Sequence, residues 1–177
     1  MNQKAKAYLK HLRNNPEKVY DKIDYLYGEL KDYLKVIKEL GIDKDSVVFD
    51  VGIGNGTFLV NLIWQAKCKG IGVEPVKTRY EKAKAYRDKW NLTDKLELHN
   101  EHYPCEIEMK PTHVILHACA FKKTTALEIY KALPKGVKIL HNSRWIREYA
   151  HPKDTNVINI KSSYMKKIGS RFYIHEK

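Results

Sequence analysis

The fold is decided by one stretch, Val47-Val48-Phe49-Asp50-Val51-Gly52-Ile53-Gly54-Asn55-Gly56-Thr57. An apolar run enters a cluster of alternating glycines, and a helical apolar pattern then extends from about Thr57 to Ala66. Glycine allows a sharp turn between a strand and a helix, because it has no Cβ and adopts positive φ angles. The stretch therefore predicts a buried strand, a tight glycine-rich turn and a helix.

Downstream, the same alternation of strand and helix repeats. A second strand, Gly70–Val73, ends in Glu74, and a Lys-rich and Arg-rich helix is expected from Val76 to Trp90. The remaining elements predicted in this region are strands at Leu96–His99, Thr112–Leu116 and Gly136–Leu140 and a helix at Thr124–Leu133. Strands that alternate with helices indicate a largely parallel sheet with helices on both faces.

The two ends of the chain differ from this pattern. Apolar residues at helical spacing run from Pro16 to Leu40, with Gly28 as a point where the segment divides into two helices. Near the other end, the alternating stretch Asn156–Ile160 and the aromatic stretch Arg171–Ile174 predict an antiparallel hairpin. We expect an α/β, Rossmann-like fold in one domain, with residues 1–40 as a helical segment and residues 41–177 as the sheet domain.

Composition excludes several classes of protein. The 177 residues are 43% hydrophobic and include three widely spaced cysteines, so neither a disulfide framework nor a metal site is expected. No apolar run reaches the roughly 18 residues of a membrane span, and the polar N-terminus does not resemble a secretion signal. We expect an intracellular protein, cytoplasmic or nuclear, without membrane contact.

The chain is strongly basic, with a formal net charge of +12. Between Lys122 and Arg147 the only acidic residue is Glu128. The basic residues of this stretch are Lys122, Lys123, Lys131, Lys135, Lys138, Arg144 and Arg147. Such an excess is typical of a surface that meets an acidic partner or nucleic acid, although a lysine-rich surface also serves solubility alone. We expect the Lys122–Arg147 region to face an acidic partner.

Two carboxylates near the glycine turn predict its ligand. Glu74, at the end of the next strand, suits the paired hydroxyls of a ribose, as in dinucleotide-binding domains. Asp50 lies where a dinucleotide enzyme places an anionic pyrophosphate, and a carboxylate there favours a cation instead. S-adenosyl-L-methionine carries an amino group and a sulfonium at that position. The pattern therefore predicts S-adenosyl-L-methionine as the cofactor, with a ligand-free structural turn as the alternative.

The predicted cofactor site extends over several loops. Glu101 and His102 follow the third strand, where the adenine is covered in class I methyltransferases, and His117 ends the fourth strand. The residues expected to contact the cofactor from these strand ends are Asp50, Gly52, Gly54, Asn55, Gly56, Thr57, Glu74, Glu101, His102 and His117. His117 is also a candidate base or hydrogen-bond acceptor for the incoming nucleophile.

Taken together, these residues resemble a family. Tyr27-Gly28-Glu29, the turn from Asp50 to Gly56, Gly72-Val73-Glu74, Ala120-Phe121, Ser143-Arg144-Trp145 and Phe172-Tyr173-Ile174-His175 occur in the order found in the Dot1-like (disruptor of telomeric silencing) histone-lysine methyltransferases. The resemblance covers about residues 25–177. It implies a class I methyltransferase fold and protein-lysine N-methylation, with a histone or another basic, nucleic-acid-associated protein as substrate.

The resemblance also implies roles for individual residues. Tyr27, Gly28 and Glu29 would form a loop over the methionine end of the donor. Phe172 and Tyr173, with Tyr27, would wall a narrow channel for the acceptor lysine, and an apolar channel favours the neutral amine.

The chain departs from the family at one important place and leaves two alternatives open. The family has two adjacent asparagines where this chain has His117-Ala118. One alternative is an RNA or small-molecule methyltransferase. The other is a non-catalytic module that binds S-adenosyl-L-methionine but has lost its acceptor site.

Overall fold

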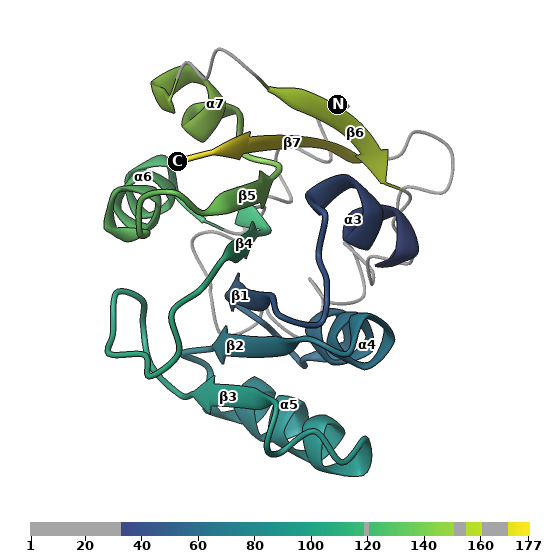
Figure 1. The fold of residues 1–177 in the computed structure, drawn as a ribbon. Helices are drawn as coiled ribbons and strands as arrows, with labels where there is room; N and C mark the ends of the chain where they lie inside the picture. The colour runs from purple at the N-terminus through teal and green to yellow at the C-terminus, as the bar shows by residue number, and fades with distance from the viewer. Residues whose placement is uncertain (1–32, 119–120, 151–154, 161–169) are drawn as a thin grey trace.

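The computed structural model describes residues 33–118, 121–150, 155–160 and 170–177, and these build one seven-stranded sheet in the order β3-β2-β1-β4-β5-β7-β6 (Figure 1). The strands are β1 (Val47–Val51), β2 (Lys69–Val73), β3 (Leu96–His99), β4 (His113–Leu116), β5 (Lys138–His141), β6 (Asn156–Ile160) and β7 (Ser170–Glu176). The described helices are α3 (Tyr33–Leu40), α4 (Thr57–Ala66), α5 (Lys77–Lys89), α6 (Lys123–Ala132) and α7 (Arg144–Ala150).

The predicted fold class is confirmed. Strands β1 to β5 pair in parallel, and β7 is antiparallel to both of its neighbours, β5 and β6. The C-terminal hairpin is therefore attached to the parallel sheet through its second strand, and β6 forms the edge. Helices α3, α4 and α5 lie on one face of the sheet, and α6 and α7 lie on the other (Figure 1).

Helix α7 is an element that the sequence analysis did not predict. Its start carries a helix-capping signal, because the Ile146 backbone N–H donates to Ser143 Oγ at 3.3 Å. The helix has seven residues, too few for a clear apolar period, and only Ile146 is buried within it.

The order of the strands creates a switch point beside β1. The chain runs outward from β1 through β2 to β3, then returns to the other side of β1 and continues through β4 to β5. Loops that follow β1 and β4 therefore leave in opposite directions at the carboxyl edge of the sheet, the place where α/β proteins bind their ligands. Asp50 pairs with Ile115 across this switch point.

Helix α3 completes the first face. Val36 and Leu40 are fully buried in its core, and the Tyr33 and Phe58 rings stack with centroids 5.4 Å apart. The predicted helices and the break at Gly28, in residues 1–32, lie outside the described residues. No described helix is long and apolar enough to cross a membrane.

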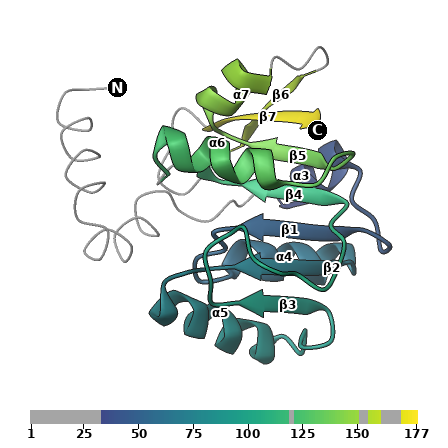
Figure 2. The same cartoon turned by 90° about the vertical axis from the view of Figure 1, so that its left-hand side faces the viewer.

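The second face is covered in an unusual way opposite β1 to β3. Residues 100–111, the covering segment, form neither helix nor strand and run between β3 and β4 (Figure 2). Alternate side chains of the segment pack onto the sheet. The inward residues are Tyr103, Cys105, Ile107 and Met109. Tyr103 packs edge-on against Phe49 with ring centroids 5.1 Å apart, and its hydroxyl donates to the Ala132 carbonyl at 3.0 Å. Glu97 of β3 accepts the Glu108 and Met109 N–H groups at 2.9 and 3.2 Å.

Candidate functional site

The glycine turn after β1 is held tightly against its surroundings. Gly52 and Ile53 both donate their N–H groups to the Val73 carbonyl, at 2.9 and 3.1 Å, which ties the turn to the end of β2. Gly56 has φ +80°, and a Cβ at this position would lie 3.0 Å from the Ala83 Cβ of α5. A Cβ at Gly52, with φ +84°, would lie 3.1 Å from the Phe121 ring. The predicted turn is present, and contacts with α5 and Phe121 are two of the reasons that it needs glycine.

Glu74 reaches from the end of β2 to the glycine turn. Its carboxylate accepts the Gly54 N–H at 3.0 Å and the Val76 N–H at 2.9 Å, and the side chain is almost fully buried. Arg79 of α5, also buried, places a guanidinium nitrogen 3.9 Å from the same carboxylate. Sequence reasoning missed Arg79, since an arginine in a Lys-rich and Arg-rich helix carries no signal of burial.

Asp50 is the second buried carboxylate at this edge, with 5% of its surface exposed. The pKa of Asp50 is raised to about 7, chiefly because the carboxyl is buried; His117 opposes this rise and the Glu74 charge adds to it. A cation bound beside Asp50 would favour the ionised form. The donor set, two buried carboxylates on adjacent strands, therefore fits a ligand with a ribose and a positive charge.

His117 lies beyond the end of β4, at the predicted place. Its ring centroid is 5.6 Å from that of Phe172, which is fully buried in the face that α3 and α4 cover. The adjacent Ala118 donates its N–H to Asn142 Oδ1 at 2.9 Å, which joins the ends of β4 and β5. Asn142 was not among the predicted site residues, although its position directly after a strand was a usable signal.

Tyr173 lies on the other face of the sheet from Phe172. Successive side chains of a strand alternate between faces, and the Tyr173 ring packs 5.4 Å from His141. The structure thus brings Phe172 to His117 and separates Tyr173 from both. This corrects the expectation that Phe172 and Tyr173 wall one channel, because adjacent strand residues cannot present their rings on the same face.

The other predicted site residues are spread around the carboxyl edge. Glu101 and His102 are exposed after β3, and Asn55 and Thr57 are half-buried in the glycine turn and at the start of α4. Asn100 donates to the Glu74 carbonyl at 2.8 Å, so the loops after β2 and β3 are linked. Tyr27, Gly28 and Glu29 lie outside the described residues.

Two histidines fill the interior between β5, β7 and α6. His141 is fully buried, its Nδ1 accepts the Ser143 N–H at 3.2 Å, and its Nε2 has no hydrogen-bond partner. The rings of His141 and His175 pack edge-on with centroids 5.1 Å apart. Burial, reinforced by His175, lowers the pKa of His141 to about 3, so His141 is neutral in this core.

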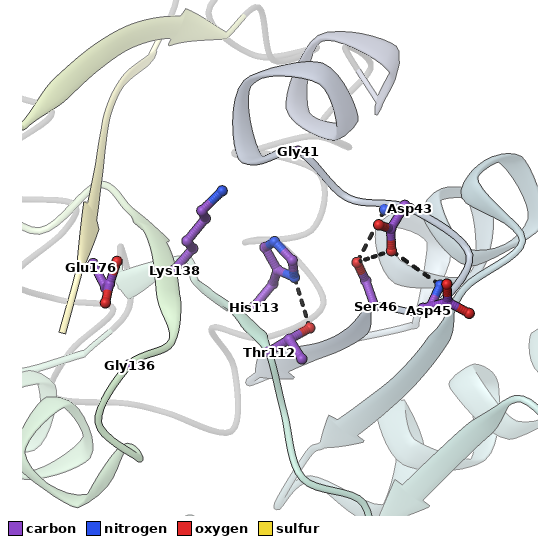
Figure 3. A pocket seen from close by; sticks show the side chains of 9 residues that line it. All are labelled: Gly41, Asp43, Asp45, Ser46, Thr112, His113, Gly136, Lys138 and Glu176. Carbon is purple, nitrogen blue, oxygen red and sulfur yellow. Dashed lines mark hydrogen bonds between the residues drawn. The ribbon is translucent and has the colours of Figure 1, made fainter.

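A polar pocket of about 300 Å³ opens at the opposite, amino edge of the sheet (Figure 3). It is lined by Gly41, Asp43, Asp45, Ser46, Thr112, His113, Gly136, Lys138 and Glu176. Its central groups are bonded within the protein: Asp43 accepts from Ser46 Oγ at 2.8 Å, and both His113 ring nitrogens have partners. None of the predicted site residues lines this pocket. Among the described residues, no group of three or more His, Cys, Asp or Glu side chains could hold a metal ion.

Comparison with known proteins identifies relatives of the fold. The chain matches no protein-family model and no curated protein sequence. It is similar to an RNA methyltransferase from Salinibacter ruber, in complex with S-adenosyl-L-homocysteine, with 16% identity and a TM-score of 0.61 over 81% of this chain and 88% of that one.

Two further structures show the same likeness. The tRNA methyltransferase TrmI from Aquifex aeolicus has 16% identity and a TM-score of 0.63 over 83% of this chain and 68% of that one. The C-terminal domain of a precorrin-6Y methyltransferase from Rhodobacter capsulatus has 13% identity and a TM-score of 0.62 over 87% and 95%.

The chain spans only about half the length of some larger structures that it matches, 46% and 48% in two cases. At these identities the likeness concerns the fold. The protein has the Rossmann-like fold of class I S-adenosyl-L-methionine-dependent methyltransferases.

Proposed function

We propose that this protein is an S-adenosyl-L-methionine-dependent methyltransferase whose cofactor binds at the carboxyl edge, between β1, β2 and β4. The observation that carries the proposal is the pair of buried carboxylates, Asp50 and Glu74, on either side of a glycine turn in a methyltransferase fold. A structural turn has no need of Asp50, because a buried carboxylate without a ligand costs stability.

Each carboxylate has a distinct task in this proposal. Glu74 accepts hydrogen bonds from the Gly54 and Val76 N–H groups, which fix its carboxylate beside the glycine turn, and in this proposal that carboxylate holds the ribose hydroxyls. Asp50 would pair with the amino and sulfonium end of the donor. Backbone groups of Gly52, Gly54, Asn55, Gly56 and Thr57 would approach the ligand, and Glu101 and His102 would flank the adenine.

Methyl transfer by direct displacement requires few acid or base groups from the protein. Bound S-adenosyl-L-methionine supplies a methyl group on a positively charged sulfur, and direct displacement transfers that methyl to a nucleophile held in line with the leaving sulfur. In this proposal His117, which follows β4 at the switch point, would accept a hydrogen bond or a proton from the nucleophile. Phe172, packed against His117, would limit the positions of the ring.

The acceptor is the second part of the proposal. The resemblance to the Dot1-like family supports a protein lysine, and the RNA, tRNA and precorrin methyltransferases of similar fold support RNA or a small molecule instead. We favour the RNA or small-molecule acceptor, since Tyr173 does not join Phe172 in the channel that a lysine acceptor would require.

Two measurements test the proposal together. Titration calorimetry with S-adenosyl-L-homocysteine should show one site per chain. Transfer of radiolabelled methyl groups should then be measured on total RNA, tRNA, DNA, nucleosomes, free histones and lysate metabolites. We expect label on RNA or a small molecule; label confined to histone lysine would restore the protein-lysine acceptor. Donor binding with no labelled acceptor would favour the non-catalytic module, and no donor binding would refute the proposal.

A further inference from the structure

The carboxyl ends of β4 and β5 and the start of β7 form a continuous part of the sheet edge next to the proposed donor site. The Ala118–Asn142 hydrogen bond fixes the ends of β4 and β5 together. Tyr173 pairs with His141, the last residue of β5, so Arg171 lies just beyond the end of β5 and near the start of α7. Residues from three distant parts of the sequence are thus gathered at one edge.

This part of the edge is positively charged. The described residues that follow β4 and β5 or begin β7 are 117–118, 121–125, 141–147 and 170–172. Apart from histidines, their charged side chains are all cationic and exposed. They form what we call the cationic rim: Lys122, Lys123, Arg144, Arg147 and Arg171.

One exposed carboxylate, Glu148, follows Arg147 in α7, so the five exposed cations of the rim outnumber it. Asp50 and Glu74 belong to the same sheet edge, but both are buried, and Glu74 is matched by Arg79. A ligand that approaches from solvent therefore meets the cations first. Fields of this kind attract anionic partners and repel cationic ones, such as a histone tail.

Aromatic rings accompany two of the arginines. The Arg144 guanidinium carbon lies 5.9 Å from the centroid of the Trp145 ring, and that of Arg147 lies 5.1 Å from Tyr173. Trp145 is half-buried and Tyr173 is buried. An arginine beside a partly exposed ring, as at Arg144 and Trp145, is a combination that holds phosphates bidentately and stacks on nucleobases. A phosphorylated small molecule would engage only one or two of five cations spread over three strand ends.

We infer that the cationic rim binds the phosphates of a single-stranded nucleic acid and directs one of its bases toward His117. The inference rests on the proposed function, since it names the class of acceptor for the same site. A single strand is required because Asp50 is buried at the edge, and a base stacked within a duplex cannot reach a buried donor without being extruded.

The test is binding of a labelled 20-nucleotide RNA to the full chain, followed by fluorescence anisotropy. We expect single-stranded RNA to bind at least about five times more tightly than the same RNA as a duplex. The logarithm of the affinity should fall with the logarithm of the salt concentration with a slope of about −3.5, as for some five phosphate contacts on a single strand. Equal or tighter binding of duplex RNA, or binding of a histone-tail peptide without RNA binding, would overturn the inference.

Reversing the charge of two rim residues tests whether the cationic rim is the RNA-binding surface. Lys122→Glu with Arg144→Glu should weaken RNA binding at least tenfold, and acidic residues at these two helix starts favour folding. The matched control, Lys84→Glu with Lys89→Glu, makes the same charge change at exposed positions of α5, on the other side of the molecule. It should change binding less than about twofold. Equal losses of RNA affinity in both variants would mean that the net charge of the protein accounts for binding. That result would refute the rim as the RNA-binding surface.

Calorimetry with S-adenosyl-L-homocysteine on the same variants separates this inference from the proposed function. The rim variant should keep the donor affinity of the wild type. RNA binding that depends on the rim, without donor binding in any variant, would retain the docking surface and refute the methyltransferase. Donor binding together with an unaltered RNA affinity in the rim variant would retain the methyltransferase and refute the docking surface.

Discussion

The two halves of the sheet differ in the direction of their strands and in the burial of their charged side chains. The proposed donor half, β1 to β3, is entirely parallel, and its buried carboxylates, Asp50 in β1 and Glu74 directly after β2, come from one local stretch of sequence. The proposed acceptor half, β4 to β7, includes an antiparallel hairpin, three buried histidines and exposed cations. The proposed donor is the same molecule in every methyltransferase, so a local motif can hold it. The proposed acceptor surface is instead assembled from segments far apart in the chain.

The largest expected effect tests how rigid the donor half is. Gly56→Ala should lower the free energy of unfolding by roughly 2–5 kcal/mol, because strain at φ +80° adds to overlap with Ala83. Gly136→Ala, before β5, is the matched control, since its φ is +76° but no atom lies within 4 Å of the added Cβ. The control should lose only about 1–2 kcal/mol of strain in urea unfolding. Equal losses would show that packing against α5 does not constrain the turn.

Removal of Glu74 should have the next largest effect. Glu74→Ala should weaken S-adenosyl-L-homocysteine binding at least tenfold, because the ribose loses charged hydrogen bonds. The same change leaves Arg79 without its carboxylate, so the melting temperature must be measured as well. Glu74→Gln keeps the side-chain shape, so its affinity should lie between those of the wild type and of Glu74→Ala. Unchanged calorimetric affinity in a folded Glu74→Ala protein would place the ribose elsewhere.

Asp50 links donor binding to pH. Because burial raises its pKa to about 7, a cationic ligand that needs the ionised form should bind about tenfold more tightly at pH 8 than at pH 6. Asp50→Asn should bind weakly and without this pH dependence. Asp43→Asn, at the amino edge, is the control and should retain it. A flat pH profile in the wild type would mean that Asp50 does not face the charge of the ligand.

The same carboxyl predicts a stability effect of opposite sign. Since the pKa of Asp50 is raised in the folded state, its contribution is complete below about pH 4 and is lost as the pH rises through about 7. The unliganded Asp50→Asn protein should therefore melt a few degrees higher than the wild type at pH 8, and not at pH 5. A lower melting temperature at pH 8 would contradict the burial of an ionised group.

The smallest expected effect lies in the acceptor half. The pKa of His141 is lowered to about 3, so its contribution to stability is present above about pH 6.5 and is lost as the pH falls toward 3. His141→Phe loses the bond from Ser143, about 1 kcal/mol at pH 7, but should make thermal stability less dependent on pH between 6.5 and 4. His102→Ala, at an exposed position, should keep the slope of the wild type.

The sequence predicted the donor half better than the acceptor half, for physical reasons. Glycines and acids at fixed spacing predict a turn and the class of ligand proposed for it, because these residues belong to elements that are neighbours in the sequence. The Arg79 pair, the Ala118–Asn142 bond and the packing of Phe172 against His117 depend on which strands become neighbours. That order is set by tertiary packing, and no local pattern encodes it. The short α7 was missed because tertiary burial of Ile146, rather than periodicity, stabilises it.

The covering segment, residues 100–111, gives the two faces of the sheet unequal kinetic protection. A helix shields its own amides through a ladder of internal hydrogen bonds, but this segment is tied down at separate points, by the Tyr103 hydroxyl and by Glu97. Local opening can therefore expose Phe49 while α4 and the opposite core stay closed. In amide hydrogen exchange, residues 100–111 should exchange long before the strands that they cover. The loop after β3, next to the proposed adenine site, would then be ordered in part by the ligand it helps to bind.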